Sequence, residues 1–168
     1  MLNVLNNFSH TYDLLMADVD YQKLYDVIKP YLKKENTICD AGCGTGHFLL
    51  FLVKKGYDIT GVDIDTEMLK LAYDKLVEHE CYAPLYEHDI RKPFKNEFDV
   101  IISVFDVIHY FKGLKAVFKN MYQALSTQGL FIFDVFKEDA MTCYHGYVEE
   151  QTYPISYQWQ ITLQNHIC

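Results

Sequence analysis

The sequence lacks several features that mark familiar classes of protein. Basic residues are too few to balance the acidic ones, with 15 Lys and Arg against 23 Asp and Glu and a net charge of −8. A broad nucleic-acid interface usually shows as an excess of basic residues, so this balance disfavours one. No apolar run approaches the roughly 18 residues of a membrane span. Asn and Asp interrupt each early apolar run, so we expect neither a signal peptide nor a membrane partner.

The cysteines and histidines also lack the spacing of a metal or redox site. The five cysteines form no C-x-x-C pair, which disfavours zinc and thioredoxin-like sites. Scattered cysteines in a chain without a signal peptide indicate a reducing cytoplasm. We therefore expect a cytoplasmic protein without a metal. The residues concerned are Cys39, Cys43, Cys81, Cys143 and Cys168, together with His88, His145 and His166.

Short apolar runs alternate with amphipathic stretches through residues 35–136. This alternation predicts βαβ units, hence an α/β fold with a doubly wound, mostly parallel sheet. Residues 1–34 predict a helical lead-in, and residues 137–168 predict a β-rich tail. The whole chain fits one domain by its size.

Local signals place several helices and their ends. Residues 66–80 and 114–125 carry apolar residues at helical spacing, and Gly56 and Gly129 are expected to end helices. In the lead-in, Asp20 is expected to cap a helix that Pro30 kinks. One face of that helix is expected to carry Leu24, Val27, Ile28 and Tyr31.

Residues 40–46, Asp-Ala-Gly-Cys-Gly-Thr-Gly, are the most informative stretch. Alternate glycines let the backbone turn sharply and approach a ligand closely. The helix N-terminus behind them attracts an anionic or electron-rich group. Asp40, ahead of the glycines, suits a ligand that also carries positive charge. The predicted strand 58–63 ends at Asp63, about 20 residues beyond the loop, the spacing at which an acid reaches a ribose diol.

Two interpretations of this pattern are a nicotinamide dinucleotide site and an S-adenosylmethionine site. The dinucleotide fingerprint is G-x-G-x-x-G, whereas this chain has Gly42, Gly44 and Gly46 at alternate positions behind Asp40. The difference disfavours a pyrophosphate and favours the methionine end of S-adenosylmethionine.

The chain resembles the class I S-adenosylmethionine-dependent methyltransferases, which have a Rossmann-like fold. Five signatures carry the resemblance, in the order in which that family has them: residues 40–46, Asp63, residues 88–90 (His-Asp-Ile), residues 98–103 and residues 129–134. The segment 12–21 is also similar to the lead-in of a group of small bacterial methyltransferases of unassigned substrate. In that group the lead-in helices cover the cofactor site.

The resemblance implies a set of cofactor contacts. The methionine portion would meet Asp40, Gly42 and Gly44, the ribose would meet Asp63, and the adenine would meet Asp89 and the Ile90 N–H. The remaining contacts would be Ile64 and Met68 around the adenine, Phe105 along the cofactor, and Tyr12 and Tyr21 at its carboxylate.

Structural alternatives stand beside these contacts. The glycines form a plain tight turn in one alternative, and Asp63 caps the next helix in another. Asp89 can instead make a turn before Arg91. Ile64, Met68 and the two tyrosines can simply pack in the core.

Asp106 and His109 are the candidate catalytic groups, because they follow the fourth predicted strand three residues apart. A histidine suits proton transfer near neutral pH. The alternative is that Asp106 caps the following segment and His109 is a surface turn residue. Methyl transfer depends mainly on alignment, so no catalytic residue type is obligatory.

The tail departs from the resembled family, whose sheet has seven strands. Apolar and polar residues alternate through residues 155–164, which predicts an antiparallel strand, with residues 148–153 as its hairpin partner. Five core strands precede Lys137, so the usual last strands are not found. An open sheet edge favours association, and a homodimer through the tail is our hypothesis.

The sequence leaves two classes of function open. The first is a methyltransferase that acts on a small molecule, with RNA or protein acceptors as second choices. No Asn-Pro-Pro-Tyr or Pro-Cys motif of nucleic-acid methylation is present. The second class is a non-catalytic cofactor-binding or interaction module. A dehydrogenase ranks third.

Overall fold

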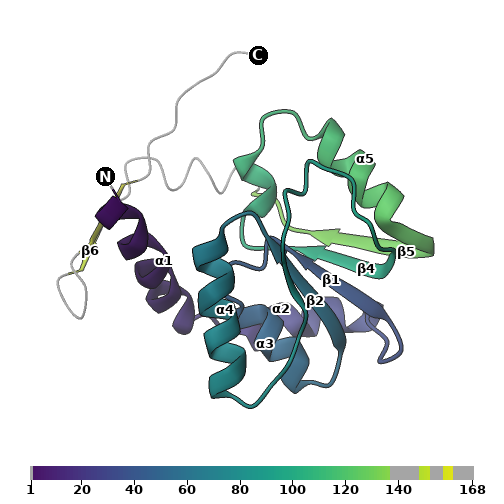
Figure 1. Ribbon diagram of the computed structural model, residues 1–168, viewed down its shortest axis with the longest axis horizontal. Helices are drawn as coiled ribbons and strands as arrows, with labels where there is room; N and C mark the ends of the chain where they lie inside the picture. The colour runs from purple at the N-terminus through teal and green to yellow at the C-terminus, as the bar shows by residue number, and fades with distance from the viewer. Residues whose placement is uncertain (1, 137–147, 152–156, 161–168) are drawn as a thin grey trace. The chain divides into compact units, whose positions relative to one another are not determined.

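The computed structural model of the protein describes residues 2–136, 148–151 and 157–160. The chain divides into two compact units, residues 1–134 and 135–168. The first unit holds the sheet with its helices, and the second holds a hairpin (Figure 1). No helix among the described residues is both long enough and apolar enough to cross a membrane.

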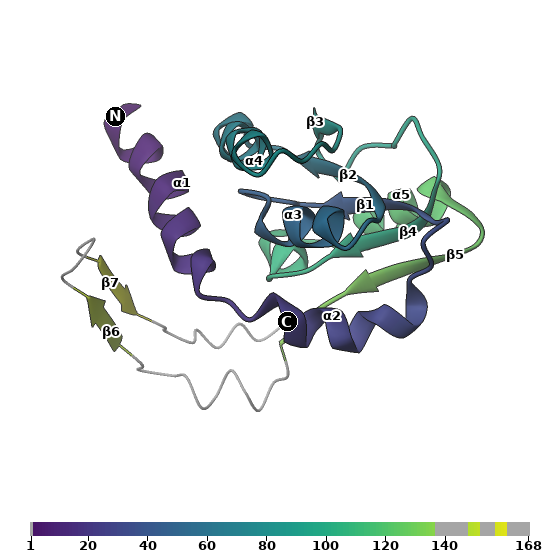
Figure 2. The same cartoon turned by 90° about the horizontal axis from the view of Figure 1, so that it is seen from below.

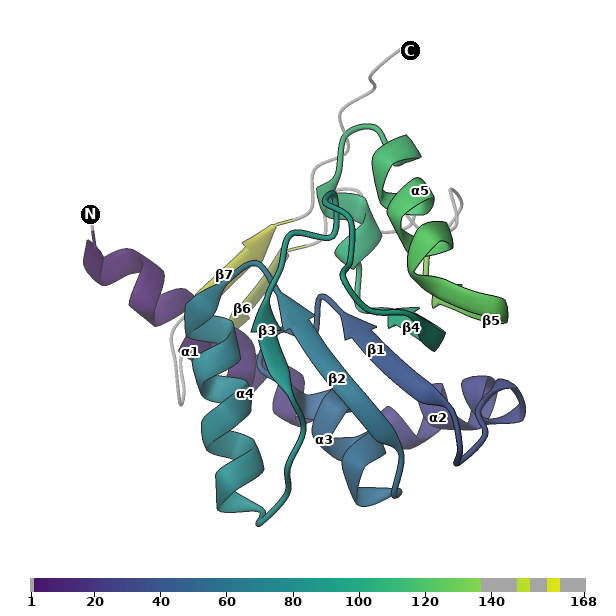
Figure 3. The same cartoon turned by 45° about the vertical axis from the view of Figure 1, so that its right-hand side comes forward.

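A parallel sheet forms the centre of the first unit, with strand order β3-β2-β1-β4-β5 among the described residues. Its strands are β1 (Thr37–Ala41), β2 (Asp58–Asp63), β3 (Leu85–Glu87), β4 (Phe98–Ser103) and β5 (Leu125–Phe133). Figure 3 shows β3, β2, β1 and β4 side by side. The predicted doubly wound parallel sheet is thereby confirmed.

Helices cover both faces of the sheet, since the crossover between two parallel strands usually runs through one. The helices α2 (Tyr21–Ile28), α3 (His47–Lys54) and α4 (Thr66–Glu78) pack on one face. The helix α5 (Lys115–Ala124) and the 3₁₀ turn η2 (Val107–Tyr110) pack on the other. Figure 2 shows α3 in front of the strands and α5 behind them.

Alternate strand residues supply these two faces, as the period of a strand requires. In β1, Ile38 joins the cluster under α2 and α3, whereas Cys39 joins the cluster under α5. In β4, Val100 and Ile101 divide in the same way. All four side chains are buried, and this fixes the register of the strands that carry the site.

The lead-in consists of α1 (Leu2–Ala17), α2 and the 3₁₀ turn η1 (Lys29–Tyr31). Asp20 caps α2 as predicted, and its carboxylate accepts from the Lys23 N–H at 3.3 Å. The predicted apolar face of α2 was partly wrong, because Val27 is 69% exposed and Tyr31 58% exposed. The helix ends at Ile28 before Pro30, so Tyr31 lies in a 3₁₀ turn that breaks the helical spacing.

Gly129 does not end a helix, contrary to the prediction. The helix α5 ends at Ala124, and β5 begins directly at Leu125, so Gly129 lies inside the strand. The pairing register of β5 with β4 shifts between Phe98 and Val100, opposite this part of β5. A glycine within a strand often marks such an irregularity. Gly56 does follow α3, with a φ of +81°.

The second unit contains a hairpin of β6 (Val148–Gln151) and β7 (Tyr157–Gln160), which pair antiparallel. The other residues of the predicted tail, at 137–147, 152–156 and 161–168, lie outside the described residues. The predicted association through the tail therefore stays a prediction.

Candidate active site

The carboxyl ends of β1, β2 and β4 meet at one edge of the sheet, where ligands bind in doubly wound folds. The glycine loop, residues 40–46, joins β1 to α3 at this edge. Its Gly42, Gly44 and Gly46 have φ values of +90°, +53° and +78°. A side chain disfavours this backbone conformation, so the loop needs glycine there.

The three glycines face different neighbours. A Cβ at Gly42 would lie 2.6 Å from the methyl groups of Val107, and a Cβ at Gly46 would lie 2.7 Å from a side chain of α4. These two glycines therefore allow close packing. A Cβ at Gly44 would instead meet, among the described residues, just the ring of Tyr12 at 3.6 Å. The backbone at Gly44 is thus open to the space above the loop.

Asp63, the last residue of β2, holds the loop through its carboxylate. Its Oδ2 accepts from the Gly44 N–H at 2.8 Å, and its Oδ1 accepts from the Asp65 N–H at 2.9 Å. The cap of α4 is Asp65, which accepts from the N–H groups of Glu67 and Met68. The alternative in which Asp63 caps α4 was therefore wrong. Burial raises the pKa of Asp63, although the hydrogen bonds that its carboxylate accepts lower the pKa in part.

Asp40 is the buried carboxyl group of the site, with 3% of its surface exposed. Burial, and then the nearby charge of Asp63, raise its pKa from 3.8 to about 7. Near neutral pH the group is therefore divided between its neutral and ionised forms. A cation bound beside it would favour the ionised form.

A cavity of about 310 Å³ opens beside Gly44 and Asp63. This volume lies within the range of about 300–1,000 Å³ that small-molecule sites occupy. Its walls are formed by residues from the lead-in, the glycine loop, β2, α4 and the segments that follow β3 and β4. Its lining includes these residues predicted to hold a cofactor: Tyr12, Gly42, Gly44, Asp63, Ile64, Met68, Asp89, Ile90 and Phe105.

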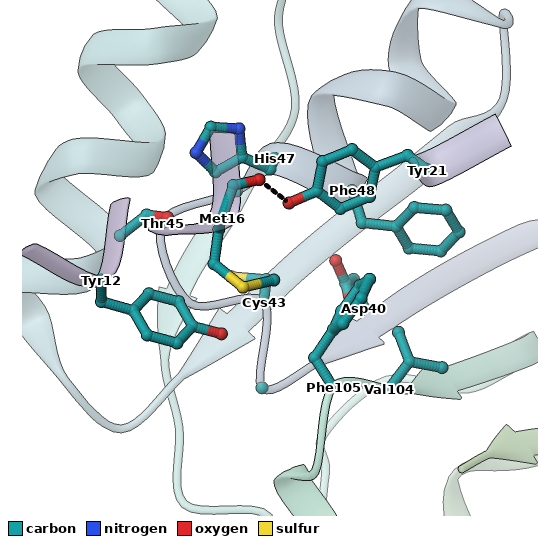
Figure 4. A pocket seen from close by; sticks show the side chains of 12 residues that line it. Tyr12, Met16, Tyr21, Asp40, Cys43, Thr45, His47, Phe48, Val104 and Phe105 are labelled. Carbon is teal, nitrogen blue, oxygen red and sulfur yellow. Dashed lines mark hydrogen bonds between the residues drawn. The ribbon is translucent and has the colours of Figure 1, made fainter. Parts of the chain in front are cut away.

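A smaller cavity of about 20 Å³ lies between the glycine loop and the lead-in (Figure 4). Asp40 and Tyr21, the two remaining predicted residues, line it. The Tyr21 hydroxyl donates to the Met16 carbonyl at 2.7 Å, and its ring meets the ring of Phe105 edge-on at 5.6 Å. Every predicted cofactor residue therefore lines one of these cavities, although Tyr21 already has a partner in the lead-in.

Tyr12 lines both cavities and reaches them from α1. Burial, and then the nearby Tyr110, Asp63, Asp106 and Asp40, together raise the pKa of Tyr12 to about 12. The phenol is consequently neutral at physiological pH and available as a hydrogen-bond donor. Its position agrees with the predicted cover of the site by the lead-in.

Asp89 makes the turn that the sequence left open as an alternative. Its Oδ1 accepts from the Arg91 N–H at 2.9 Å, and the guanidinium of Arg91 donates to both carboxylate oxygens. These hydrogen bonds lower the pKa of Asp89 to about 2. The carboxylate nevertheless lines the larger cavity beside Ile90. Its contact with an adenine stays a prediction.

The chain leaves β4 through an unusual turn. Phe105 and Asp106, termed the β4 turn, have φ values of +61° and +69° although neither is glycine. The carboxylate of Asp134 accepts from both of their N–H groups, at 2.8 Å and 3.3 Å. Asp134 was not predicted from the sequence as a site residue. Its one signal is its place directly after β5, whose carboxyl end lies beside that of β4.

Asp106 and His109 lie outside the lining of both cavities. Asp106 precedes η2, but its side chain makes no capping hydrogen bond. Burial and the neighbouring charge of Asp134 raise the pKa of Asp106, while His109 acts in the opposite direction. His109 is exposed. The structure thus places the two groups near each other, and their catalytic role stays a prediction.

Asp13, His47 and Lys75 join α1, α3 and α4 beside the glycine loop. The Asp13 carboxylate accepts from the Lys75 ammonium and lies 2.9 Å from His47 Nε2. Burial would raise the pKa of Asp13, but hydrogen bonds from Lys75 and Thr45 outweigh it and lower the pKa. This group was not predicted from the sequence, since its members lie 34 and 28 residues apart and form no local pattern.

Comparison with known proteins identifies the family. The methyltransferase domain family matches residues 38–129, which is more than half of the chain. The chain belongs to this family. The match covers the strands β1, β2, β3 and β4 with the glycine loop, and it ends within β5.

Two relatives and one solved structure support the assignment. The chain is 30% identical to "Putative methyltransferase YqeM" of Bacillus subtilis (strain 168), over 94% of this chain and 66% of that protein. It is 28% identical to "Putative methyltransferase GWCH70_2453" of Geobacillus sp. (strain WCH70), over 77% and 56%. The crystal structure of an S-adenosylmethionine-dependent methyltransferase from Clostridium acetobutylicum ATCC 824 matches with a TM-score of 0.78 and 28% identity, over 96% and 70%.

These similarities confirm the predicted resemblance and S-adenosylmethionine as the cofactor of the family. The chain spans 66% and 56% of the lengths of the two curated relatives. The acceptors of the relatives therefore do not transfer to this chain by similarity.

The residues of the site fit this cofactor on three observations. The cavity has the volume of a small-molecule site, at about 310 Å³. Gly44 leaves the backbone open where the cofactor would lie against it. The buried carboxyl of Asp40 provides a partner for positive charge. Among the described residues, no group of three or more His, Cys, Asp or Glu could hold a metal ion.

Proposed function

We propose that the chain is an S-adenosylmethionine-dependent methyltransferase that acts on a small-molecule acceptor. The observation that carries the proposal is the cavity of about 310 Å³ at the carboxyl ends of the strands, where the Asp63 carboxylate and the open backbone of Gly44 meet. The family assignment supports the reaction class. A cytoplasmic location, as the sequence suggests, is part of the proposal.

The charge of the cavity walls supports a small acceptor over RNA. The larger cavity includes Asp63, Asp65 and Asp89 in its lining, and the smaller one includes Asp40. Neither lining contains a Lys or Arg among the described residues. Nucleic-acid binding depends on basic groups that neutralise phosphates. An RNA acceptor, a protein acceptor and a cofactor-binding module without catalysis remain as alternatives.

Each residue has a separate task in this proposal. S-adenosylmethionine supplies a methyl group on a positively charged sulfur. Asp40 balances positive charge in the methionine portion, and Asp63 accepts hydrogen bonds from the ribose while it holds Gly44. Phe105 and Tyr12 exclude water from the space between them. Such alignment in a dry site supplies most of the acceleration of a displacement reaction.

We propose that Asp106 and His109 accept the proton that a hydroxyl or ammonium group of the substrate releases when it takes up the methyl group. His109→Ala is then expected to leave cofactor affinity unchanged and to slow turnover. Loss of cofactor binding in this variant would assign His109 to the cofactor site instead.

The decisive experiment is calorimetric titration with S-adenosylhomocysteine, with NAD as the control ligand. We expect micromolar affinity for the first and none for the second. Asp63→Ala is expected to weaken binding by about 2 kcal/mol, or roughly 30-fold, the scale of hydrogen bonds to a charged group. Asp58→Ala removes an exposed carboxylate at the opposite end of β2 and should have no effect on affinity.

Two outcomes would overturn the proposal in different ways. Binding of NAD in place of S-adenosylhomocysteine would favour the dehydrogenase. Binding of S-adenosylhomocysteine without turnover of S-adenosylmethionine on small molecules, RNA or protein would favour the non-catalytic module. Turnover on RNA or protein alone would change the acceptor class and leave the enzyme class intact.

A further inference from the structure

The β4 turn holds a backbone conformation that its own residues disfavour. Phe105 and Asp106 are consecutive, and both have positive φ values, +61° and +69°. The left-handed region is disfavoured for a residue that carries a Cβ. Such conformations persist where surrounding contacts impose them, and they cluster at functional sites.

The carboxylate of Asp134 is the contact that imposes this turn. Its Oδ2 accepts from the Phe105 N–H at 2.8 Å, and its Oδ1 accepts from the Asp106 N–H at 3.3 Å. Both amides of the turn thus bind one carboxylate, 28 and 29 residues away in the sequence. Hydrogen bonds to an ionised acceptor are about twice as strong as neutral ones.

The β4 turn positions two side chains of the site, those of Phe105 and Val107. The side chain of Phe105 lines both cavities, and its ring meets those of Tyr21 and Phe48 edge-on, at 5.6 Å and 6.2 Å. Val107, directly after the turn, fills the space beside Gly42 so closely that a Cβ there would lie 2.6 Å from its methyl groups. A change in the β4 turn would therefore move an aromatic wall and a support of the glycine loop together.

We infer that Asp134 is a positioning residue, whose carboxylate holds the β4 turn and thereby places Phe105 and Val107 around the cofactor cavity. The inference rests on the proposed function for the identity of the ligand. Asp134 itself lies outside the lining of both described cavities, so it acts through the turn.

A general role in stability is the competing explanation, and the opposite end of β4 offers a matched control. There the carboxylate of Asp99 accepts from the Thr37 N–H at 2.9 Å and from the Ser126 hydroxyl at 2.8 Å. Asp99 and Asp134 thus both accept a backbone N–H of a neighbouring segment. Asp99 lies far along the strand from the cavity edge, so its loss should lower stability without a change in cofactor affinity.

The test compares the affinity for S-adenosylhomocysteine of Asp134→Ala, Asp134→Asn and Asp99→Ala, each shown to be folded by circular dichroism. Asp134→Ala should bind about tenfold more weakly than the parent, the effect of losing a hydrogen bond to a charged group. Asp134→Asn should lose about threefold, since its amide oxygen still accepts from one N–H. Asp99→Ala should bind as the parent does.

A rescue variant separates positioning from stability. Asp106→Gly places glycine at one of the two positions that require a positive φ, so the turn should form more readily without the Asp134 carboxylate. The double variant Asp134→Ala with Asp106→Gly should bind within about threefold of Asp106→Gly alone. Failure of this rescue, or an equal loss of affinity in Asp99→Ala, would overturn the inference.

Amide hydrogen exchange tests, without any ligand, whether the Asp134 carboxylate holds the β4 turn. The N–H groups of Phe105 and Asp106 should exchange faster in Asp134→Ala than in the parent, because their acceptor is gone. Unchanged exchange rates would overturn the inference that Asp134 holds the β4 turn. Absence of S-adenosylhomocysteine binding in the parent protein would instead overturn the proposed function. It would also overturn the effect of Asp134 on cofactor binding.

Discussion

Two turns at the same edge of the sheet adopt left-handed backbone conformations with different kinds of residue. The glycine loop after β1 and the β4 turn both pass through left-handed backbone. The loop uses glycine at each such position, at residues 42, 44 and 46. The β4 turn uses Phe105 and Asp106, and its conformation depends on the carboxylate of Asp134.

The difference shows what each turn can offer to a ligand. Glycine adopts positive φ without strain and exposes the backbone, as Gly44 does towards the cavity. The β4 turn gives up that freedom and gains side chains, so that Phe105 can form a wall. One turn therefore presents backbone to the cofactor, and the other presents an aromatic surface.

Gly44→Val should break the first half of this comparison and have the largest effect. The new side chain would strain a φ of +53° and project its methyl groups into the cavity. We expect a loss of about 3 kcal/mol or more in the binding of S-adenosylhomocysteine, roughly 100-fold, measured by calorimetry. Gly113→Ala is the control, because Gly113 also has a positive φ of +83°, and a Cβ there would meet no described atom within 4 Å. An equal loss of affinity in that control would contradict the prediction.

The pH dependence of binding should sharpen the role of Asp40, at the start of the glycine loop. With a pKa of about 7, the carboxyl is mostly ionised at pH 8 and mostly neutral at pH 6. The ionised form is the partner of positive charge, so affinity for S-adenosylhomocysteine should fall about tenfold from pH 8 to pH 6. Calorimetry across this range should show the fall in the parent protein. An unchanged pH profile in Asp40→Asn would exclude Asp40 as its source.

The same group should affect stability with a defined sign. Its pKa is higher in the folded protein than the ordinary value of 3.8, so the unfolded chain binds fewer protons between about pH 4 and pH 7. The contribution of Asp40 to the free energy of unfolding should consequently fall as pH rises through this window. Denaturation of the ligand-free protein should show a weaker fall in Asp40→Asn.

Asp106→Gly should make the β4 turn more like the glycine loop, and we expect it to have the smallest effect. Glycine relieves the strain at a φ of +69°, partly offset by the greater freedom of the unfolded chain. We expect a gain of about 1 kcal/mol in the free energy of unfolding, measured with urea. Gln128→Gly, at a φ of +67° in β5, should give a similar gain. A loss of stability in Asp106→Gly alone would show that its side chain contributes more than its backbone costs.

The sequence predicted much of the fold because the signals involved are local. The strand β2 was placed at residues 58–63, where the structure has it, and the signature at residues 98–103 coincides with β4. Buried apolar runs and the spacing between them fix such strands within a few residues. Gly129 was misread because a glycine after an apolar helix has two local meanings, a helix end and a strand irregularity.

The candidate site divides along the same line. The residues predicted to hold the cofactor all line a cavity. Most of them lie at or after the carboxyl ends of parallel strands, which must share one edge, whereas Tyr12 and Tyr21 belong to the lead-in helices α1 and α2. Asp13, His47 and Lys75 were missed because their contact depends on how three helices pack. The predicted pair of Asp106 and His109 follows the correct strand, but the turn leaves both outside the cavity lining.

The sequence by itself determined the order of strands and helices, the glycine loop and the carboxylates at the ends of β1 and β2. These features depend on neighbours in the chain, where glycine, apolar spacing and strand length act directly. The tertiary structure alone decided that Asp40 would be buried enough to titrate near neutral pH and that Asp134 would hold the β4 turn. Both outcomes arise from groups on different strands that only the folded sheet brings together.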